Sequence, residues 1–296
     1  MTTKTSGRGE GTHPDGSRSR PVRRRHAGRS IWERIPRIVS VPLFGAFLVL
    51  VWQCAVWFEW ASKLVLPPPV DVARETGDIV GSIVSGEYVW ESFWVTTKEV
   101  VIGFVLAAIT GIGLGIVSAE TAFGREVLQP FLVALYAAPK VAFAPIFVAW
   151  LGFDIWPKVL MVVVIAFFPL LVDTAAGLAA LEPNQDKLFR SMRASRAQTF
   201  RKLKLYNALP FVFAGLKTAS VLAVVGAIVG EFLGGGTGLG AQIRISSSRL
   251  AMDRVFGYVV VLSAMAYALY AAVAVAERRI VFWRKAGFMP DVVVEV

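Results

Sequence analysis

The chain has 296 residues, of which 55% are hydrophobic, and its formal net charge is +10. Uncharged runs such as residues 100–119 and 255–276 are long enough to cross about 30 Å of hydrocarbon as helices. There is one cysteine, both histidines lie in the N-terminal segment, and no G-x-x-x-x-G-K-[ST] motif occurs, which excludes a disulfide framework, a metalloprotease or haem bundle, and a P-loop. We therefore expect an all-α, polytopic membrane protein that itself binds no metal or cofactor.

The first segment, residues 1–40, is rich in Gly, Ser, Arg and Pro and has three consecutive arginines at 23–25. This composition buries too little apolar surface to fold, so we expect a disordered cytoplasmic tail. The tail suits a topology anchor attracted to anionic lipid, or a site for a specific partner. A cleaved signal peptide is not expected, because the basic region is long and a full-length span follows it.

The apolar runs predict about six spans within a membrane domain at 41–280, followed by a cytoplasmic tail at 281–296. The spans fall at residues 42–60, 93–118, 127–150, 157–178, 209–232 and 255–276. With both termini in the cytoplasm, the inside segments hold 22 of the 31 Lys and Arg residues and the outside loops hold six. This bias explains the net charge without nucleic acid as a partner. Its weak point is the third outside loop, which carries Arg244, Arg249 and Arg254.

Small residues repeat every four positions on two of these spans. The second span has Gly103, Ala107, Gly111 and Gly115, and the fifth has Gly215, Ala219, Ala223 and Ala227. Such a face lets the backbone of a neighbouring helix approach closely. Tight packing is sufficient for the second span, whereas the fifth face could also line a narrow pathway or let helices slide.

Prolines at 139, 145 and 169 interrupt the third and fourth spans, where each removes a backbone donor and can kink the helix. Lys140 follows Pro139, and an ionisable group inside a membrane is a functional candidate. Lys140 is either an interfacial anchor or a charge that faces the pathway. Asp173 and Glu231 stand near the ends of spans, where a structural role is the ordinary interpretation.

The loop at 180–208 is cationic, and its pattern predicts a helix, a turn and a second helix. Pro183 suits the first position of a helix, and Ser195 with Gln198 fits a capping box that starts another helix after a turn near 193–195. The first helix has an apolar face made of Leu188, Phe189 and Met192. The loop either rests on anionic headgroups as an amphipathic hairpin or docks into a groove of a partner protein.

The stretch LFRSMRASRAQTFRKLKLYNALPFVFAGLKTA (188–219) resembles the EAA loop of ABC-importer permeases, a cytoplasmic signature. That loop reads E-A-A-x-x-x-G, nine variable residues, and then an apolar-x-L-P. Placed on residues 187–206, the pattern puts its E-A-A on residues 187–189 and its Gly on Arg193, so all four signature residues are replaced here. We therefore expect either a shifted turn or an unusual φ at Arg193.

Four further stretches resemble the nitrate, sulfonate and taurine permease group, and they occur in the order and spacing of that group. They are LPPP (66–69), APKVAFAPIFVAWLGF (138–153), FFPLLVDTAAGL (167–178) and GAIVGEFLGGGTGLG (226–240). The G-x-G-x-G pattern in the last stretch follows a span on the expected outer side. A dinucleotide site would need a strand before it, so that interpretation fails.

The resemblance implies a type I permease subunit of an ATP-driven importer, spanning the plasma membrane of a bacterium several times. Two permease chains, here expected to be a homodimer, would form one pathway in the bilayer. Two cytoplasmic ATPase subunits would bind ATP and Mg, and an extracytoplasmic binding protein would deliver the solute. ATP binding would draw the paired loops together and open the pathway outward. The chain itself would be no enzyme and would hold no catalytic residue.

Candidate residues for these roles can be assigned. Coupling to the ATPase is expected at Lys187, Leu188, Phe189, Arg190, Met192, Arg193, Ala194, Ser195 and Arg196, with the apolar side chains of 188, 189 and 192 as knobs. Our candidates for the pathway are Pro139, Lys140, Phe143, Ala219, Ala223, Ala227 and Glu231.

A positive pathway would favour a small anion such as a sulfonate, taurine or nitrate. Related permeases also serve thiamine-precursor pyrimidines, so the same architecture importing such a nutrient is the alternative. In a different class, a stand-alone channel or secondary transporter would show an inverted repeat between its halves, which we do not find. A membrane-embedded enzyme would need a reactive constellation within the spans.

Overall fold

The computed structural model describes residues 37–60, 62 and 65–283, and it divides into two units, residues 1–51 and 52–296. In the first unit the described residues begin helix α1 (Arg37–Trp57), whose side chains at 42–50 are exposed. The expected tails at 1–40 and 281–296 lie largely outside the described residues, so their character stays a prediction.

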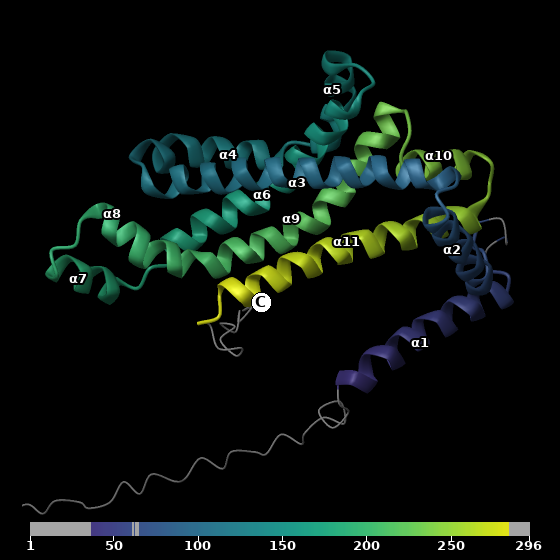
Figure 1. Cartoon of the computed structure of the whole chain (residues 1–296), viewed down its shortest axis with the longest axis horizontal. Helices are drawn as coiled ribbons and strands as arrows, with labels where there is room; N and C mark the ends of the chain where they lie inside the picture. The colour runs from purple at the N-terminus through teal and green to yellow at the C-terminus, as the bar shows by residue number, and fades with distance from the viewer. Residues whose placement is uncertain (1–36, 61, 63–64, 284–296) are drawn as a thin grey trace, which may run out of the picture. The chain divides into compact units, whose positions relative to one another are not determined.

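The second unit contains only helices in the part of the chain that the structure describes (Figure 1). Its elements are α2 (Pro69–Val84), α3 (Tyr88–Glu120), η2 (Gly124–Leu128), α4 (Gln129–Ala137), η3 (Lys140–Phe143), α5 (Ala144–Leu151), α6 (Ile155–Ala179), α7 (Pro183–Ser191), α8 (Arg196–Thr199), η4 (Phe200–Lys204), α9 (Leu205–Gly234), α10 (Leu239–Ser248) and α11 (Met252–Ile280). The all-α class expected from the sequence is therefore confirmed.

Among the described residues, four helices are long and apolar enough to cross a membrane, namely α3, α6, the continuous helix Arg196–Gly234 and α11. A fifth crossing results if Gly124–Ala137 and Lys140–Leu151, which are bent by 88°, form one broken span. The apolar part of α1, Pro42–Trp57, is shorter than these helices. The polytopic class is thus confirmed, and the expected count of six is approximate.

The expected third span at 127–150 is broken at Pro139, one of the prolines expected to interrupt it. Helix α4 ends at Ala137, Ala138 and Pro139 are extended, and η3 then leads into α5. A proline drives the residue before it out of the helical region and lacks the N–H that would continue the helix. Helices α2 and α10 occupy segments expected to be loops, because short helices of mixed polarity leave no long apolar run.

Helix α6 packs between α3 and α9, and small residues on both neighbours permit the close approach. A Cβ atom on Gly111 of α3 would lie 2.9 Å from the carbonyl oxygen of Phe167, and one on Gly226 of α9 would lie 2.7 Å from the Cα of Val162. Both distances are shorter than a carbon side chain tolerates, so glycine is required. The tight packing expected for the second span therefore also holds for the fifth.

The segment after the cationic turn is one continuous helix of 39 residues from Arg196 to Gly234. At a rise of about 1.5 Å per residue it is about 58 Å long. The sequence places the entry to the span at Pro210, but this proline is buried inside the helix and does not end it. One element therefore joins the α7–α8 turn to the glycine-rich segment before α10, and Figure 1 shows α7 and α8 at the end of α9 opposite to α10.

Candidate functional site

The turn between α7 and α8 is the first candidate site. Helix α7 starts with Pro183 in its first turn and ends at Ser191. The Arg193 N–H donates to the Arg190 carbonyl at 2.9 Å, and the Ala194 N–H donates to the Phe189 carbonyl at 3.0 Å. This is a Schellman motif, whose left-handed position usually holds glycine. Arg193 occupies that position with a φ of 54°, so the unusual φ expected there is confirmed.

A capping box fixes the same turn from the other side, as the sequence predicts. The Gln198 N–H donates to Ser195 Oγ at 3.2 Å, and the Ser195 N–H donates to the Gln198 side chain at 2.8 Å. The two bonds satisfy backbone N–H groups that would otherwise lack a partner at the start of α8. The turn is therefore specified by hydrogen bonds at both of its ends.

Two apolar side chains project from this turn. Leu188 is 57% exposed and Met192 is 64% exposed, whereas Phe189, expected to be a third knob, is half-buried. Cations surround them, with Lys187, Arg190, Arg193 and Arg196 all exposed. The only acid that pairs with them among the described residues is Asp186, at 2.8 Å from Arg190. The surface therefore suits a groove with an apolar floor and an acidic rim.

The turn is attached firmly to the helices of the core. The Lys204 ammonium lies 2.8 Å from the Glu120 carboxylate at the end of α3, and the Asn207 side chain donates to the Ala180 carbonyl at 3.1 Å. These contacts join the second helix of the loop to the ends of α3 and α6. A force on the turn would consequently reach the membrane helices directly.

The second candidate site is a cleft at the break between α4 and α5. Its volume is about 370 Å³. It is lined by Thr110, Leu135, Lys140, Phe143, Phe147, Trp150, Val163, Val164, Phe167 and Phe168. The Lys140 ammonium lies 4.2 Å from the ring centre of Tyr136 and 5.0 Å from that of Phe168, and it donates to the Tyr136 carbonyl at 3.2 Å. Cation–π contacts thus hold this charge against the aromatic wall.

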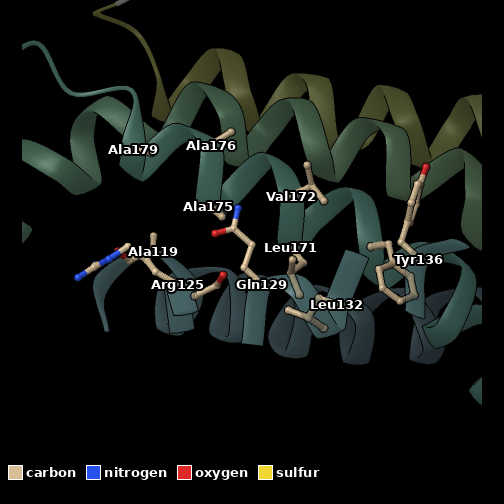
Figure 2. Close-up of a pocket in the computed structure, with 12 residues that line it drawn as sticks. Ala119, Arg125, Gln129, Leu132, Tyr136, Leu171, Val172, Ala175, Ala176 and Ala179 are labelled. Carbon is tan, nitrogen blue, oxygen red and sulfur yellow. The ribbon is translucent and has the colours of Figure 1, made fainter. Parts of the chain in front are cut away.

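A further groove of about 320 Å³ lies between α4 and α6, beside the end of α3 (Figure 2). Its side formed by η2 and α4 carries Arg125, Gln129 and Tyr136, and small residues of α6, including Ala175 and Ala176, form the opposite side. Phe168 lines both this groove and the cleft at Lys140. The rings of Tyr136 and Phe168, 5.4 Å apart, therefore stand where the two spaces meet.

A buried group of charges joins α3, α6 and α9, and the sequence did not single it out. Thr96, Glu99, Lys158 and Glu231 are all buried. Lys158 Nζ lies 3.0 Å from Glu99 Oε1 and 3.1 Å from the Thr237 carbonyl. Thr96 donates to Glu231 at 2.6 Å and accepts from the Leu239 N–H at 2.9 Å. We call these four residues the buried charge cluster.

The glycines that follow α9 lie against the Glu231 carboxylate of this cluster and make room for it. The Glu231 carboxylate accepts from the N–H groups of Gly240 and Ala241, at the start of α10. A Cβ atom on Gly238 would overlap that carboxylate, and Gly238 has a φ of 151°. The run of glycines beside a lone acid at the end of an apolar span is the signal that could have located the cluster.

Comparison with known proteins agrees with this architecture. Residues 111–282 match the family described as binding-protein-dependent transport system inner membrane component. The chain belongs to this family, and it is an ABC-importer permease. It is a transport subunit, not an enzyme, and a multi-pass protein of the plasma membrane. The resemblance inferred from its motifs is therefore confirmed.

Named relatives of this permease carry different solutes. It is 32% identical to the formylaminopyrimidine transport permease protein ThiX of Halalkalibacterium halodurans, over 82% of this chain and 95% of the relative. It is 31% identical to the riboflavin transport system permease protein RibX of Chloroflexus aurantiacus, over 83% and 90%. It is 25% identical to the taurine transport system permease protein TauC of Escherichia coli, over 80% and 87%.

The structure separates the residues that the sequence grouped as pathway candidates. Lys140 and Phe143 line the cleft at the helix break, and the exposed Pro139 precedes them. Ala219, Ala223 and Ala227 are buried and form part of the core, and none of them lines a described cleft, so their place on the pathway stays a prediction. Glu231 belongs to the buried charge cluster. Tyr136 and Phe168 beside Lys140 were missed, because single aromatic residues in apolar runs carry no distinct pattern.

Proposed function

We propose that this permease imports a small solute at the expense of ATP hydrolysed by partner ATPase subunits, which dock at residues 187–196. The observation that carries the proposal is the exposed apolar pair Leu188 and Met192 on a hydrogen-bonded turn. Two exposed apolar side chains that lie inside a charged rim suit a transient helix-in-groove contact. The surrounding cations would meet acidic groups on the ATPase.

The proposal includes an orientation and a stoichiometry. Both termini and the docking turn lie in the cytoplasm, as the distribution of Lys and Arg favours. Two copies of the permease form the pathway, two ATPase subunits hold ATP and Mg, and an extracytoplasmic binding protein delivers the solute. The permease residues contribute the docking surface and the pathway but no catalytic group.

Complex formation with the ATPase tests the docking site. The permease carrying Leu188→Asp and Met192→Asp should lose most of its co-purifying ATPase, because two charges would replace the apolar knobs that fill the groove. Val84→Asp is the matched control, since Val84 is also an apolar residue, 82% exposed, on another helix. The variants are first shown to elute as wild type in size-exclusion chromatography. An ATPase that binds the double variant as well as the wild type would rule out docking at this turn.

The cleft beside Lys140 suggests two classes of solute. A single cation in the pathway favours a small anion such as a sulfonate, taurine or nitrate. The aromatic wall of Phe143, Phe147 and Phe168 favours a second candidate, a planar heterocycle that stacks on rings, and the relatives named for formylaminopyrimidine and riboflavin carry such solutes.

One pair of variants distinguishes the two classes. Lys140→Met removes the charge and should abolish most uptake of an anion while sparing a neutral heterocycle, whereas Phe143→Ala should do the reverse. Uptake is measured in vesicles with the solute that mass spectrometry finds retained on the purified binding protein. Equal uptake by wild type and both variants would show that the cleft is not on the pathway.

A further inference from the structure

The groove between α4 and α6 has a cationic end and an aromatic end. Arg125 lies at one end and Tyr136 at the other, with Gln129 between them (Figure 2). The lining residues of η2 and α4 recur every three or four positions, so they share one helix face, and they are Arg125, Gln129, Leu132 and Tyr136. The acid next to this face, Glu126, is not among the residues that line the groove. The cation therefore stands at the groove without an acid from its own helix.

The guanidinium group of Arg125 has hydrogen-bond donors to spare. One of its nitrogens, Nη1, donates to the Ala119 carbonyl at 2.8 Å, which orients the side chain. Arg125 is exposed, and no carboxylate among the described residues forms an ion pair with it. Glu120, at the end of α3, is paired with Lys204 instead. An oriented guanidinium whose remaining N–H groups lack an acid suits a phosphate, whose oxygens accept two parallel hydrogen bonds.

The side of the groove that α6 forms is apolar along its whole length. Its side chains are those of Phe168, Leu171, Val172, Ala175, Ala176 and Ala179. Val172 is 52% exposed, and Phe131 on α4 is 64% exposed, so the apolar surface continues outside the groove. A polar solute would leave its polar groups unpaired against this side, at a cost in desolvation. The groove therefore suits a hydrocarbon chain.

The groove is as long as one leaflet of a membrane. The path from Arg125 to Tyr136 along η2 and α4 is about 16 Å at a helical rise of about 1.5 Å per residue. Half of a hydrocarbon core of about 30 Å is about 15 Å. The Lys204–Glu120 ion pair joins the end of α3 to the helix that starts at the α7–α8 turn, so the Arg125 end lies on the side of that turn. In the proposed orientation the groove therefore runs from the cytoplasmic headgroups to the middle of the bilayer.

We propose that this groove binds one anionic phospholipid of the cytoplasmic leaflet, with its phosphate on Arg125 and Gln129 and one acyl chain along α6. The inference rests on the orientation in the proposed function, but not on docking of the ATPase. Anionic lipids give the cytoplasmic leaflet its negative surface potential, and basic pockets between membrane helices on this side suit their headgroups. The bound lipid would join α4 to α6 across the groove.

The test uses the full-length permease, purified in a neutral detergent. Native mass spectrometry measures the lipid bound as phosphatidylglycerol is added, with phosphatidylcholine as the neutral reference. The wild type should bind one phosphatidylglycerol per chain, and Arg125→Ala should weaken this binding about tenfold, because a charge-assisted, two-pronged contact is lost. Phosphatidylglycerol should also raise the unfolding temperature of the wild type more than that of Arg125→Ala.

Three further variants isolate the groove. Ala175→Leu fills it without a change in charge and should weaken binding of phosphatidylglycerol by a similar factor. Arg125→Lys keeps the charge but not the planar fork, so it should retain part of the binding. Arg278→Ala removes an exposed arginine at the end of α11 that lines none of the described clefts, and it should bind as the wild type does. An equal loss in Arg278→Ala would assign the result to net charge and overturn the proposal, as would undiminished binding in Arg125→Ala.

Other occupants of the groove give different results. Inorganic phosphate that displaces phosphatidylglycerol at an equal concentration would show a site for a free anion. Loss of the permease dimer in Ala175→Leu, with binding of phosphatidylglycerol unchanged, would show that a second permease chain covers the groove. Either outcome overturns the proposal. Failure of the proposed function is separable, because neither the ATPase nor the binding protein takes part in this measurement.

Discussion

At the scale of single residues, the described part of the chain places three residues other than glycine at positive φ, namely Glu59, Arg193 and Leu250. Each follows the end of a helix, and in each case two successive N–H groups bond back to the helix in the Schellman pattern. A side chain in this conformation costs about 1–2 kcal/mol that glycine avoids. The arginine in the α7–α8 turn is therefore retained at a cost to the turn, which favours a role for its charge.

Replacing Arg193 separates the turn from the charge. Arg193→Gly should stabilise the turn by about 1 kcal/mol, whereas the β-branched Arg193→Val should destabilise it by a similar amount. Hydrogen–deuterium exchange at the amides of Arg193 and Ala194 measures the change, about fivefold slower for Gly and about fivefold faster for Val.

Arg193→Asn is the control for the loss of charge, because asparagine tolerates the left-handed region. It should exchange at nearly the rate of the wild type while weakening the association with the ATPase. Identical exchange in the Gly and Val variants would mean that backbone strain at this residue is negligible.

At the scale of elements, the sequence predicts best what a long apolar run or a local capping motif specifies. The helices α3, α6, α9 and α11 follow from runs that only a helix can satisfy in lipid, and the α7–α8 turn follows from Pro183, Ser195 and Gln198. The sharpness of the break in the third span could not be predicted, because a proline's effect depends on tertiary support. Pro210 lies within a helix held on both sides, whereas Pro139 stands at an open break.

The elements that were missed are those whose stability comes from partners far away in the sequence. Helix α10 starts at Leu239, directly after Gly238, whose backbone conformation no ordinary side chain could adopt. The Leu239 N–H donates to Thr96 and the Gly240 N–H donates to Glu231. A local pattern cannot reveal a cap that is supplied by another helix. For the same reason, the contact of Lys140 with Phe168 could not be anticipated, although Lys140 itself was recognised.

At the scale of the whole molecule, the buried charge cluster joins three long helices, and its two carboxylates, Glu99 and Glu231, interact with each other and with Lys158. Lys158 on α6 pairs directly with Glu99 on α3. Glu231 on α9 also accepts from the N-terminus of α10, where backbone N–H groups and the helix dipole offset its charge. Moving any one of these helices alone would leave a charge buried without its partner. The cluster therefore favours motion of α3, α6, α9 and α10 as one body.

This balance predicts that removing one charge costs more than removing two. Lys158→Met leaves the Glu99 carboxylate buried without a counter-charge and should destabilise the permease by about 3–5 kcal/mol, whereas Lys158→Met with Glu99→Leu should recover most of that loss, because an apolar pair of similar volume replaces the ion pair. Thermal unfolding of the detergent-purified permease measures both.

Lys140→Met is the matched control, since Lys140 is only half-buried and makes no ion pair with a described residue. The loss of stability in this variant should be smaller. A double variant no more stable than Lys158→Met alone would show that Lys158 and Glu99 do not act as a pair, and the three helices would then have to be held together by packing alone.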